Sequence, residues 1–372
     1  MANKPEPVRV GIIGAGNISS IYLESPQKFD ILNIAAIADI DMVRANAQAE
    51  KYGTKAVTVD ELLADPAIEI VINLTVPLVH GDVALKALNA GKSVYTEKPF
   101  AYDKAQAKEI LALAKKKGLL TGGAPDTFMG GGYQTVRKLM DAGEIGQPVM
   151  GVAQMFSRGM ESWHPNPDFF FQPGGGPMFD IGPYYLTAFV SMFGPAKRVA
   201  GMARITHPQR TITSQPLNGT VINVNVPTNV AGTIEFANGA LATIVMTWDV
   251  SEGYTPSLSV YGTKATLICP DPNTFGGPIK IKRADEKEFS EVAIEHGWTG
   301  NSRGLGVADM AYALRSPKRK RAHYRANGAM ANHVLELMHA FHESSVTGRH
   351  VKLKTSCEQP QAMGVSWPAS AA

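Results

Sequence analysis

The stretch VRVGIIGAGNIS, residues 8–19, decides the fold of the first part of this chain. A short run of apolar, β-branched residues leads into Gly14 and Gly16, after which the sequence becomes polar and helical in pattern. A strand that turns through glycines into a helix is the context of a dinucleotide-binding loop. There the first glycine permits a tight turn, and the second lets the backbone approach a pyrophosphate. Ser19 stands where this fingerprint prefers Gly or Ala, and glycines that serve only the turn are the alternative interpretation.

The segments around this loop alternate between buried strands and helices. ILNIAAIADID (31–41), IEIVINLTV (68–76) and KSVYTE (92–97) are apolar runs of the length that suits strands covered on both faces. Helical patterns separate them, and one begins at Asp103 and ends at Gly118, a typical N-cap and C-terminal glycine. This alternation predicts an α/β fold with a doubly wound parallel sheet, the Rossmann arrangement.

The residues after the second strand indicate which dinucleotide binds. Asp39 ends this strand, where a carboxylate accepts hydrogen bonds from the adenine-ribose hydroxyls. Asp41 adds a second carboxylate, and no arginine occurs until Arg44. Two carboxylates would repel a 2′-phosphate, so the sequence favours NAD over NADP as the cofactor. Asn17 and Ile18 complete the predicted cofactor loop.

After Gly123 the pattern changes to one helix followed by long alternating runs. Asn238-Gly239 between two of these runs predicts a hairpin, and Gly262 marks another turn. We expect an α+β domain built on a largely antiparallel open sheet, with helices over one face. The predicted domains are therefore 1–124, which binds NAD, and 125–372, which binds substrate and mediates oligomerisation. The alternating runs are PVMGVAQMFS, NVAGTIEF, ALATIVMTWDV, SLSVYG and ATLICP.

One late segment, NHVLELMHAFHE, reads as a helix of this second domain. Its apolar side chains recur on one stripe, which predicts core packing, and its histidines are not at metal-ligand spacing. We interpret these histidines as surface residues or as residues with satisfied hydrogen bonds, and we expect no metal site. The apolar residues are Val334, Leu337, Met338 and Phe341, and the histidines are His333, His339 and His342.

The composition excludes several classes of function. The 372 residues are 44% hydrophobic and 19% charged with a net charge of +3, which is too small to indicate nucleic acid or an anionic membrane as a partner. Only Cys269 and Cys357 occur, so no disulfide framework is expected. With no apolar run of membrane-spanning length and no evident signal peptide, we expect a cytoplasmic protein. The basic run SPKRKR (316–321) is interpreted as a solvated loop.

Two further motifs carry candidate chemistry. GGGPMFDIGPYY (174–185) places Asp180 and Tyr184 four residues apart, on one face of a helix that begins after Pro177. The pair is either a structural hydrogen bond or half of a proton-transfer site. Lys98 follows the fourth strand, where ligands bind in open α/β sheets, and Pro99 holds it in extended backbone with a cis bond possible.

At this point the chain resembles the glucose–fructose oxidoreductase / inositol dehydrogenase family, Gfo/Idh/MocA, over nearly its whole length. The resemblance rests on GIIGAGNIS, ADID, NLTVPLVH, Glu-Lys-Pro at 97–99 and Asp-Ile-Gly-Pro-Tyr at 180–184. In that family the lysine and the D-x-G-x-H pair line the pocket over the nicotinamide, which implies the catalytic residues Lys98, Asp180 and Tyr184. By the same resemblance Thr75, Pro77, His80, Glu97 and Lys98 contact the cofactor, and relatives pair through the C-terminal sheet, which implies a homodimer or homotetramer.

The family's usual histidine is replaced by Tyr184, which changes the acid–base chemistry. A free tyrosine has a pKa of about 10 and is a poor base at neutral pH, but a nearby ammonium favours the phenolate. If Tyr184 is the base, Lys98 must therefore lie close to it, and Asp180 orients Lys98 or the substrate hydroxyl. A second departure is APDTF (124–128), where many relatives carry asparagine or arginine. We expect these side chains at the pocket rim, which leaves the substrate class open.

The loop SRGMESWHPNPDFFFQPGGG (157–176) is the predicted specificity element. Trp163 and the phenylalanines offer flat faces for a sugar ring, whereas Arg158 and His164 suit a hydroxyl or an anion. Packing at a domain interface is the alternative for two of the three phenylalanines. The leading function is an NAD-dependent sugar oxidoreductase. The alternatives are a redox-neutral NAD-dependent glycosidase, for example on sulfoquinovosides, and a non-catalytic NAD-binding regulator.

Overall fold

The computed structural model describes residues 5–251, 257–317, 323–365 and 367. The chain divides into two compact units, each of which is described by itself: Met1–Met129 with Asn301–Asn332 and Trp367–Ala372, and Gly130–Gly300 with His333–Ser366. The chain passes from the first unit to the second after Met129, close to the predicted boundary after residue 124. The assignment of Asn301–Asn332 differs from the sequence prediction, because this segment packs with the N-terminal sheet.

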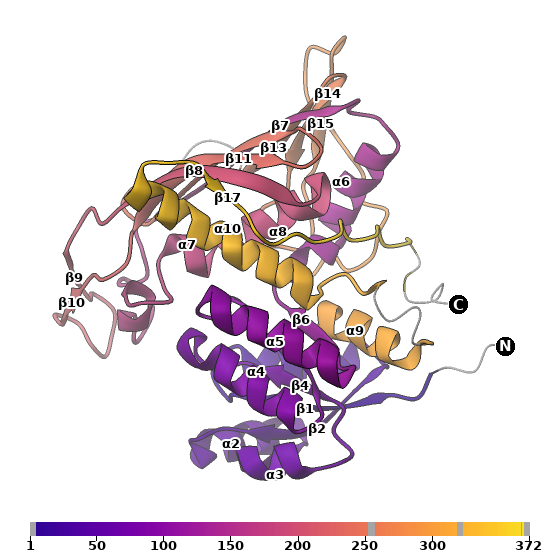
Figure 1. Cartoon of the computed structure of the whole chain (residues 1–372), viewed down its shortest axis with the longest axis vertical. Helices are drawn as coiled ribbons and strands as arrows, with labels where there is room; N and C mark the ends of the chain where they lie inside the picture. Colours follow the sequence, from indigo (N-terminus) through magenta and orange to yellow (C-terminus); the bar gives the residue numbers. More distant parts are fainter. Residues whose placement is uncertain (1–4, 252–256, 318–322, 366, 368–372) are drawn as a thin grey trace. The chain divides into compact units, whose positions relative to one another are not determined.

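The first unit is built on a six-stranded sheet in which every pair of neighbouring strands is parallel. The strand order is β3-β2-β1-β4-β5-β6 (Figure 1). The central strands are buried along nearly their whole length, as their continuous apolar runs predict. Two edge strands, β3 and β6, escaped the sequence analysis because three residues carry no readable period. The strands are β1 (Val8–Ile13), β2 (Leu32–Ala38), β3 (Lys55–Val57), β4 (Ile70–Asn73), β5 (Ser93–Thr96) and β6 (Thr121–Gly123).

The helices of this unit begin and end at residues whose chemistry explains their bounds. The Asp103 side chain accepts a hydrogen bond from the Gln106 amide at the start of α5, and Gly118 ends that helix in the left-handed conformation, both as predicted. At α3, Thr58 and Glu61 form a reciprocal capping box. The helices are α1 (Ser19–Leu23), α2 (Met42–Tyr52), α3 (Val59–Ala64), α4 (His80–Asn89), α5 (Lys104–Lys117) and α9 (Leu305–Arg315).

The second unit is built on a nine-stranded sheet in the order β16-β15-β14-β13-β7-β12-β11-β8-β17. All neighbours are antiparallel except β7 and β12, which confirms the largely antiparallel prediction. A separate hairpin pairs β9 (Gln209–Thr211) with β10 (Val221–Asn223). The nine strands are β7 (Pro148–Phe156), β8 (Ala196–Arg204), β11 (Asn229–Phe236), β12 (Leu241–Thr247), β13 (Leu258–Gly262), β14 (Ala265–Cys269), β15 (Lys280–Arg283), β16 (Ser290–Glu291) and β17 (Val351–Lys352).

Two helices cover one face of this sheet, as Figure 1 shows. Phe189 of α8 (Gly182–Phe193) packs against Gly151 of β7, and Phe341 of α10 (Gly328–Thr347) packs against Gly201 and Gly232 of the neighbouring strands. The predicted apolar stripe of α10 is buried, so its role in the core is confirmed. The remaining helices of this unit are α6 (Gly131–Asp141) and α7 (Pro177–Asp180).

Among the histidines of α10, His333 is buried with both ring nitrogens hydrogen-bonded, which agrees with the second of the two interpretations, whereas His339 and His342 are half-buried. The Ala196 amide donates to His333 Nε2 at 2.9 Å, so the ring proton lies on Nδ1 and is donated to Thr355 Oγ1, also at 2.9 Å. His342 Nε2 is buried without a hydrogen-bond partner in the described structure, and the ring of Phe179 packs edge-on against His339. The period of apolar residues predicts which face of a helix packs on the core, but it does not predict which of the other faces are covered by loops.

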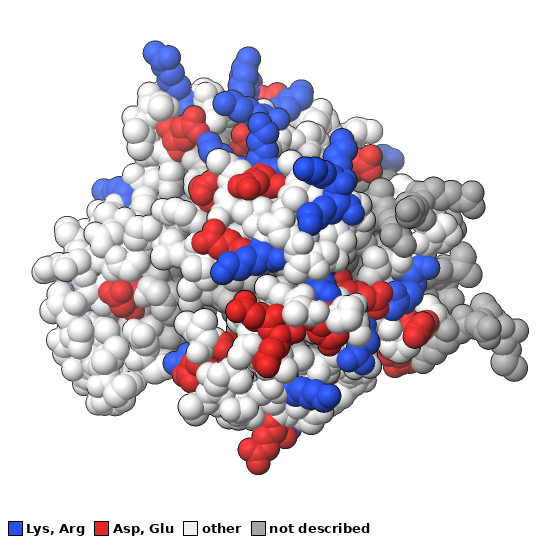
Figure 2. All heavy atoms as spheres, turned by 60° about the horizontal axis from the view of Figure 1, so that its bottom comes forward, with Lys and Arg blue, Asp and Glu red and all other residues white. Residues whose placement is uncertain are grey.

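Charged side chains of both signs are interspersed on the face shown in Figure 2, which agrees with the small net charge. The basic run SPKRKR lies for the most part outside the described residues. None of the helices in the described ranges is both long and apolar enough to cross a membrane.

Candidate active site

The loop between β1 and α1 has the features that a bound pyrophosphate requires. Gly14 has a φ of +112°, and a Cβ at this position would lie 2.6 Å from the carbonyl oxygen of Leu74, so the fold itself demands glycine there. Gly16 is different, because a Cβ there would meet nothing within 4 Å. Packing within the chain does not explain that glycine, whereas a ligand that approaches the backbone closely does. Ser19 also fits, because it is fully buried and donates its hydroxyl proton to the Gly16 carbonyl at 2.7 Å.

Asp39 joins the end of β2 to this loop. Its Oδ2 accepts a hydrogen bond from the Ala15 amide at 2.6 Å, and its Oδ1 accepts one from the Asp41 amide at 2.9 Å. Asp41 caps α2 through the Val43 amide, and its other oxygen lies 3.1 Å from Arg44 Nε. The nearest guanidinium is thus already paired with a carboxylate.

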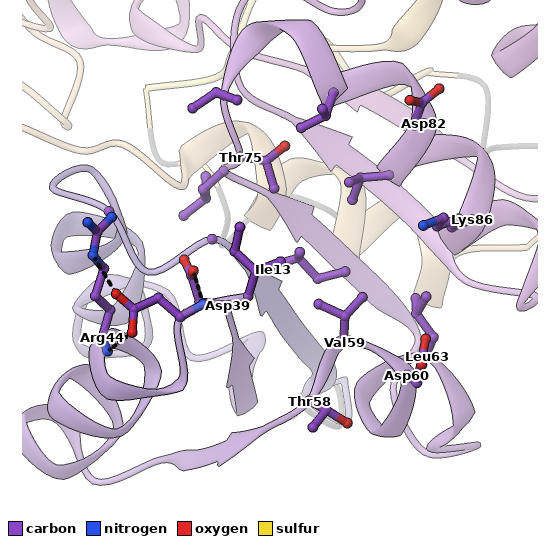
Figure 3. A pocket seen from close by; sticks show the side chains of 18 of the residues that line it. Ile13, Asp39, Arg44, Thr58, Val59, Asp60, Leu63, Thr75, Asp82 and Lys86 are labelled. Atoms are coloured by element: carbon purple, nitrogen blue, oxygen red, sulfur yellow. Dashed lines mark hydrogen bonds and ion pairs between the residues drawn. The ribbon is translucent and has the colours of Figure 1, made fainter.

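A cavity of 770 Å³ opens at the carboxyl ends of β1, β2 and β4. This is the point where the strand order reverses on either side of β1, the usual cofactor position in doubly wound sheets. Figure 3 shows Asp39 and Arg44 on one side of the cavity and Asp82 and Lys86 on the opposite side. Four carboxylates line it against two cations, an excess that disfavours an additional phosphate. The carboxylates are Asp39, Asp41, Asp60 and Asp82, and the cations are Arg44 and Lys86.

Hydrogen bonds hold the loop after β4. The buried Asn73 accepts from the Thr75 hydroxyl at 2.7 Å and donates to the His80 carbonyl at 2.8 Å. The His80 ring is 1% exposed, with Nδ1 2.7 Å from the Pro99 carbonyl oxygen and Nε2 2.9 Å from the Thr75 carbonyl oxygen. Burial lowers the pKa of His80, although the two carbonyls oppose this shift. His80 thus bridges the loop after β4 and the turn after β5.

Glu97 holds the backbone of the lysine that follows it. The Lys98 amide donates to Glu97 Oε2 at 3.0 Å, and the hydroxyl of the buried Tyr22 donates to Glu97 Oε1 at 2.7 Å. The Lys98–Pro99 bond is cis, as the sequence allowed. Lys98 itself is half-buried and directly follows β5, at the same carboxyl edge of the sheet as the cavity.

The second unit carries Asp180 and Tyr184 on two consecutive helices. The helix predicted after Pro177 begins there, but α7 ends at Asp180 and α8 starts at Gly182. The Tyr184 amide donates to the Ile181 carbonyl rather than to that of Asp180. The two side chains therefore come from separate helical turns, and not from the single helix face that their spacing predicted. Asp180 is half-buried, and Tyr184 is 7% exposed.

The predicted specificity loop is partly exposed and partly core. Trp163 is 62% exposed, and the His164 ring packs edge-on against Trp163 and Phe169. The Asn166 amide donates to His164 Nδ1, so its ring proton lies on Nε2. Arg158 is exposed and donates to the Ser251 hydroxyl at 2.9 Å.

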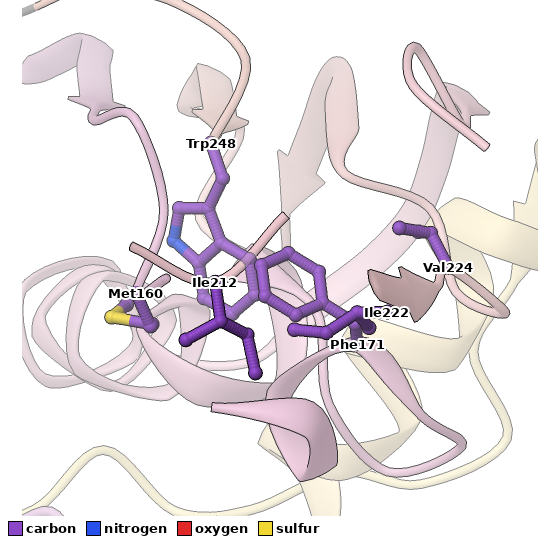
Figure 4. Packing of buried hydrophobic residues seen from close by; sticks show 6 residues of the cluster. All are labelled: Met160, Phe171, Ile212, Ile222, Val224 and Trp248. Carbon is purple, nitrogen blue, oxygen red and sulfur yellow. The ribbon is translucent and has the colours of Figure 1, made fainter. Parts of the chain in front are cut away.

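The base of this loop packs on a small apolar cluster. Phe171 is fully buried against Trp248, with Met160, Ile212, Ile222 and Val224 around them (Figure 4). Packing inside the protein therefore explains Phe171, and Phe170 lies against the same cluster.

The sequence analysis missed Arg210, which ties the loop to the β9–β10 hairpin. Its side chain is 7% exposed and pairs with the carboxylates of Glu161 and Asp249. It also donates to the carbonyls of Arg158 and Trp248, each at 2.8 Å. No motif marks this arginine, because its partners come from two segments that are distant from it in the sequence.

The sequence analysis also missed Thr58 in the lining of the cofactor cavity and the burial of Asp126 after β6. Thr58 lines the cofactor cavity, and the sequence does mark it as a helix start, because Thr58 and Glu61 have the spacing of a capping box. APDTF (124–128) was expected at the pocket rim, but Asp126 is 1% exposed and its neighbours are buried as well. That expectation was wrong, because the Asp126 carboxylate accepts hydrogen bonds from two backbone amides at the start of α9. Across the described residues, no group of three or more His, Cys, Asp or Glu side chains is placed to hold a metal ion.

Comparisons with known proteins agree with this geometry. A family profile described as "Oxidoreductase family, NAD-binding Rossmann fold" matches residues 8–122, and one described as "GFO/IDH/MocA C-terminal domain" matches residues 133–268. The chain belongs to the Gfo/Idh/MocA family of oxidoreductases. Its first unit is an NAD-binding Rossmann domain, and NAD is the cofactor that the sequence favoured.

Individual relatives cover parts of the chain. An uncharacterized oxidoreductase of Schizosaccharomyces pombe is 31% identical over 240 residues, which are 59% of this chain and 64% of the relative. An inositol 2-dehydrogenase of Salmonella typhimurium is 33% identical over 149 residues, 38% of this chain and 44% of the relative. These matches thus span less than two thirds of the relatives. A levoglucosan dehydrogenase in complex with NADH and L-sorbose shares the fold, with a TM-score of 0.79 and 20% identity over 94% of this chain and 100% of that one.

Proposed function

We propose that this protein is an NAD-dependent oxidoreductase that acts on a ring hydroxyl of a sugar or glycoside. One observation carries the proposal. The Glu97 carboxylate fixes the backbone of Lys98 at the carboxyl edge of the sheet. At the same edge, Gly16 leaves room for a pyrophosphate, and Asp39 holds the glycine loop through the Ala15 amide. Names of similar proteins support the substrate class, since one relative is an inositol 2-dehydrogenase and one fold neighbour is a levoglucosan dehydrogenase in complex with NADH and L-sorbose.

Each residue has a definite task in this proposal. NAD supplies the hydride acceptor when it is bound. The Lys98 ammonium stabilises the phenolate form of Tyr184, which takes the proton of the reacting hydroxyl and becomes a neutral phenol, and Asp180 orients the hydroxyl or the ammonium. Thr75, Pro77 and Glu97 are proposed to line the cofactor site. We propose that His80 serves it through the backbone of Thr75 and Pro99, because its ring is buried.

In the second unit, Arg158, Trp163 and His164 are the proposed substrate contacts. Trp163 supports this role because it exposes a flat apolar face on which a sugar ring can stack. His164 presents an Nε2 proton donor, since its Nδ1 accepts the Asn166 amide.

The test is an assay with NAD and a panel of free sugars and chromogenic glycosides. Net NADH formation on at least one sugar supports the proposal, and no turnover on any of them contradicts it. Gly16→Val is the control, because a side chain there meets open space in the chain but occupies the path of the pyrophosphate. We expect this variant to keep its unfolding temperature and to lose NADH binding.

A redox-neutral glycosidase remains the alternative enzyme. Transient oxidation at C3 makes the C2 proton acidic, so the C1 substituent can leave before water adds and the hydride returns. The exposed guanidinium of Arg158 supports an anionic substituent, because it is held by a hydroxyl and by no carboxylate of the described residues. Release of aglycone without net NADH would select this alternative.

We also propose that the chain forms a homodimer or homotetramer through the open face of the nine-stranded sheet. On that face the register places Met150 beside Leu241, and Met202 is 80% exposed on β8. The opposite face is covered by α8 and α10. An apolar sheet face of this kind marks an interaction surface.

A further inference from the structure

Four rings form a contiguous aromatic cluster on the predicted specificity loop. Trp163 is 62% exposed, and Phe169 is 44% exposed. The His164 ring packs edge-on against both, with centroid separations of 5.5 Å, and the Phe170 ring lies 4.0 Å from that of Phe169. Single exposed apolar side chains are common on protein surfaces, but adjoining exposed rings mark a binding surface.

Hydrogen bonds on both sides of Trp163 fix the backbone that presents its ring. The Glu161 carbonyl accepts from the amides of Thr213 and Ser214, at 2.9 and 3.1 Å. The Ser214 hydroxyl donates to the His164 carbonyl at 2.5 Å. The cluster is therefore preorganised, and a ligand that stacks on it orders little additional chain, which lowers the entropic cost of binding.

A strip of amide and carboxylate side chains accompanies the cluster. Gln172 directly follows η4 (Asp168–Phe171), the turn that carries Phe169. Gln172 Nε2 donates to Asp168 Oδ1 at 3.1 Å, and Gln172 Oε1 accepts from Asn225 Nδ2 at 2.6 Å. Within the described part of the chain, no hydrogen bond uses Asp168 Oδ2 or the side-chain carbonyl of Asn225, and both residues are exposed. These two acceptors can therefore receive hydroxyl protons from a ligand.

Flat apolar rings beside a strip of acceptors suit a saccharide. In a 3₁₀ turn, side chains three residues apart lie above one another, which puts Gln172 on the Phe169 side of η4. A pyranose offers an apolar C–H face to the rings and hydroxyl donors to the acceptors at its edge. A lipid would leave those acceptors unpaired, and an anion would meet the Asp168 carboxylate.

The ring that reacts does not account for this exposed surface. Under the proposed function the reacting hydroxyl lies at Tyr184, which is 7% exposed, and hydride transfer is favoured where water is excluded. The face of Trp163 suits a second ring that stays at the surface. The cluster and the catalytic helix are coupled, because the Gly176 amide donates to the Phe170 carbonyl at 2.7 Å and the Gly176 carbonyl accepts the Asp180 amide at 2.9 Å.

We propose that the aromatic cluster and its polar strip form a second sugar subsite, and that the substrate is a disaccharide or a longer glycoside. The ring that is not oxidised stacks on Trp163 and Phe169, and its hydroxyls donate to Asp168 and Asn225. This inference rests on the proposed function for the identity of the reacting ring, whereas saccharide binding to the cluster does not depend on it.

The first arm of the test measures binding by calorimetry, with the full-length protein saturated with NADH. The probes are disaccharides of glucose, galactose and mannose, each compared with the methyl glycosides of its component sugars. We expect at least one disaccharide to bind about tenfold more tightly than either methyl glycoside, because a stacked ring contributes roughly that factor. The absence of such a preference in every pair would overturn the proposal.

Variants tie this preference to the cluster. Trp163→Ala and Phe169→Ala should each remove most of it, and Asp168→Ala should reduce it. Phe289→Ala is the matched control, because Phe289 is a 40% exposed phenylalanine elsewhere in the same unit, and this variant should keep the preference. A preference that survives Trp163→Ala contradicts the subsite. A loss of sedimentation mass in Trp163→Ala also contradicts it, since the cluster would then be an interface between copies of the chain.

The second arm compares kcat/KM for the preferred disaccharide and for its methyl glycoside. Trp163→Ala should lower the ratio of the two values about tenfold, chiefly through the KM of the disaccharide, because a contact remote from the reacting atoms contributes uniform binding. A merely structural role of Trp163 would lower both values alike and leave their ratio unchanged.

The two arms separate the failure of this inference from that of the proposed function. If sugars are oxidised without any preference for disaccharides, the second subsite is excluded and the oxidoreductase assignment stands. If no saccharide is oxidised, the proposed function fails, and calorimetry still decides whether the cluster binds a second ring.

Discussion

The Ala15 amide donates a hydrogen bond of 2.6 Å to the Asp39 carboxylate, which joins the end of β2 to the glycine loop after β1. The carboxylate thus has a structural task beside its expected ribose contact. It holds the loop in shape, and it offers its remaining acceptor capacity to the cavity.

Changing Asp39 to Ala should weaken NAD binding far more than NADP binding, because only NAD has the free 2′-hydroxyl that the carboxylate accepts. Hydrogen bonds to a charged group contribute about 1.5–3 kcal/mol, so we expect roughly a 10- to 100-fold loss for NADH. Fluorescence titration with both reduced cofactors measures this effect. Equal affinities of the unchanged protein for NADH and NADPH would contradict the assignment.

Tyr184→Phe should abolish proton transfer and leave NADH binding intact. The loss of a positioned base costs about 10²–10⁴-fold in rate. Lys98→Ala should cost at least as much and move the acid limb of kcat/KM, on which activity rises as the Tyr184 phenol loses its proton, to higher pH. The double variant should be no slower than the worse single variant. Tyr185→Phe is the matched control, since this neighbour is also a buried tyrosine of α8. Near-full activity in Tyr184→Phe would transfer the role of base to Lys98 or Asp180.

Arg210→Met should destabilise the second unit strongly, because it leaves two carboxylates beneath the specificity loop without their partner. Breaking a buried pair from one side costs about 3–5 kcal/mol. Lys138→Ala, which removes an exposed pair with Glu295 outside the nine-stranded sheet's open face, should change the stability little. Urea denaturation of both variants gives the comparison, and similar losses for the two would rule out the anchoring role of Arg210.

The stability of the second unit should fall as the pH drops from about 6.5 to 4. Burial lowers the pKa of His333 to about 4, so below 6.5 the unfolded chain binds a proton that the folded one refuses. The loss is complete near pH 4 and amounts to about 3 kcal/mol at 1.36 kcal/mol per pH unit. Unfolding free energies of His333→Gln across this range should show a shallower slope. An unchanged slope would exclude His333 as a source of this acid sensitivity.

Met202→Asp should dissociate the proposed oligomer, because it places a charge on the open apolar face of the sheet. Sedimentation velocity at micromolar concentration reads out the mass of each variant. Val346→Asp changes a comparably exposed apolar residue on α10 and should leave the assembly intact. A parent protein that sediments as a monomer would defeat the proposal at once.

The sequence by itself determined the features that depend on local order. The period of apolar residues predicted the strands that pack in the middle of both sheets. Cap residues such as Asp103 and Gly118 predicted where α5 begins and ends, and the glycines after β1 predicted a cofactor loop. These signals are readable because each depends on neighbours within a few residues.

Only the tertiary structure decided the rest. It assigned Asn301–Asn332 to the first unit, buried Asp126 under the start of α9, and gathered the partners of Arg210 from two distant segments. It also ended α7 at Asp180, so the spacing of Asp180 and Tyr184 does not place them on one helix face. The physical reason is common to all four: burial and charge pairing are set by residues distant in sequence, and no local pattern encodes which distant residue arrives.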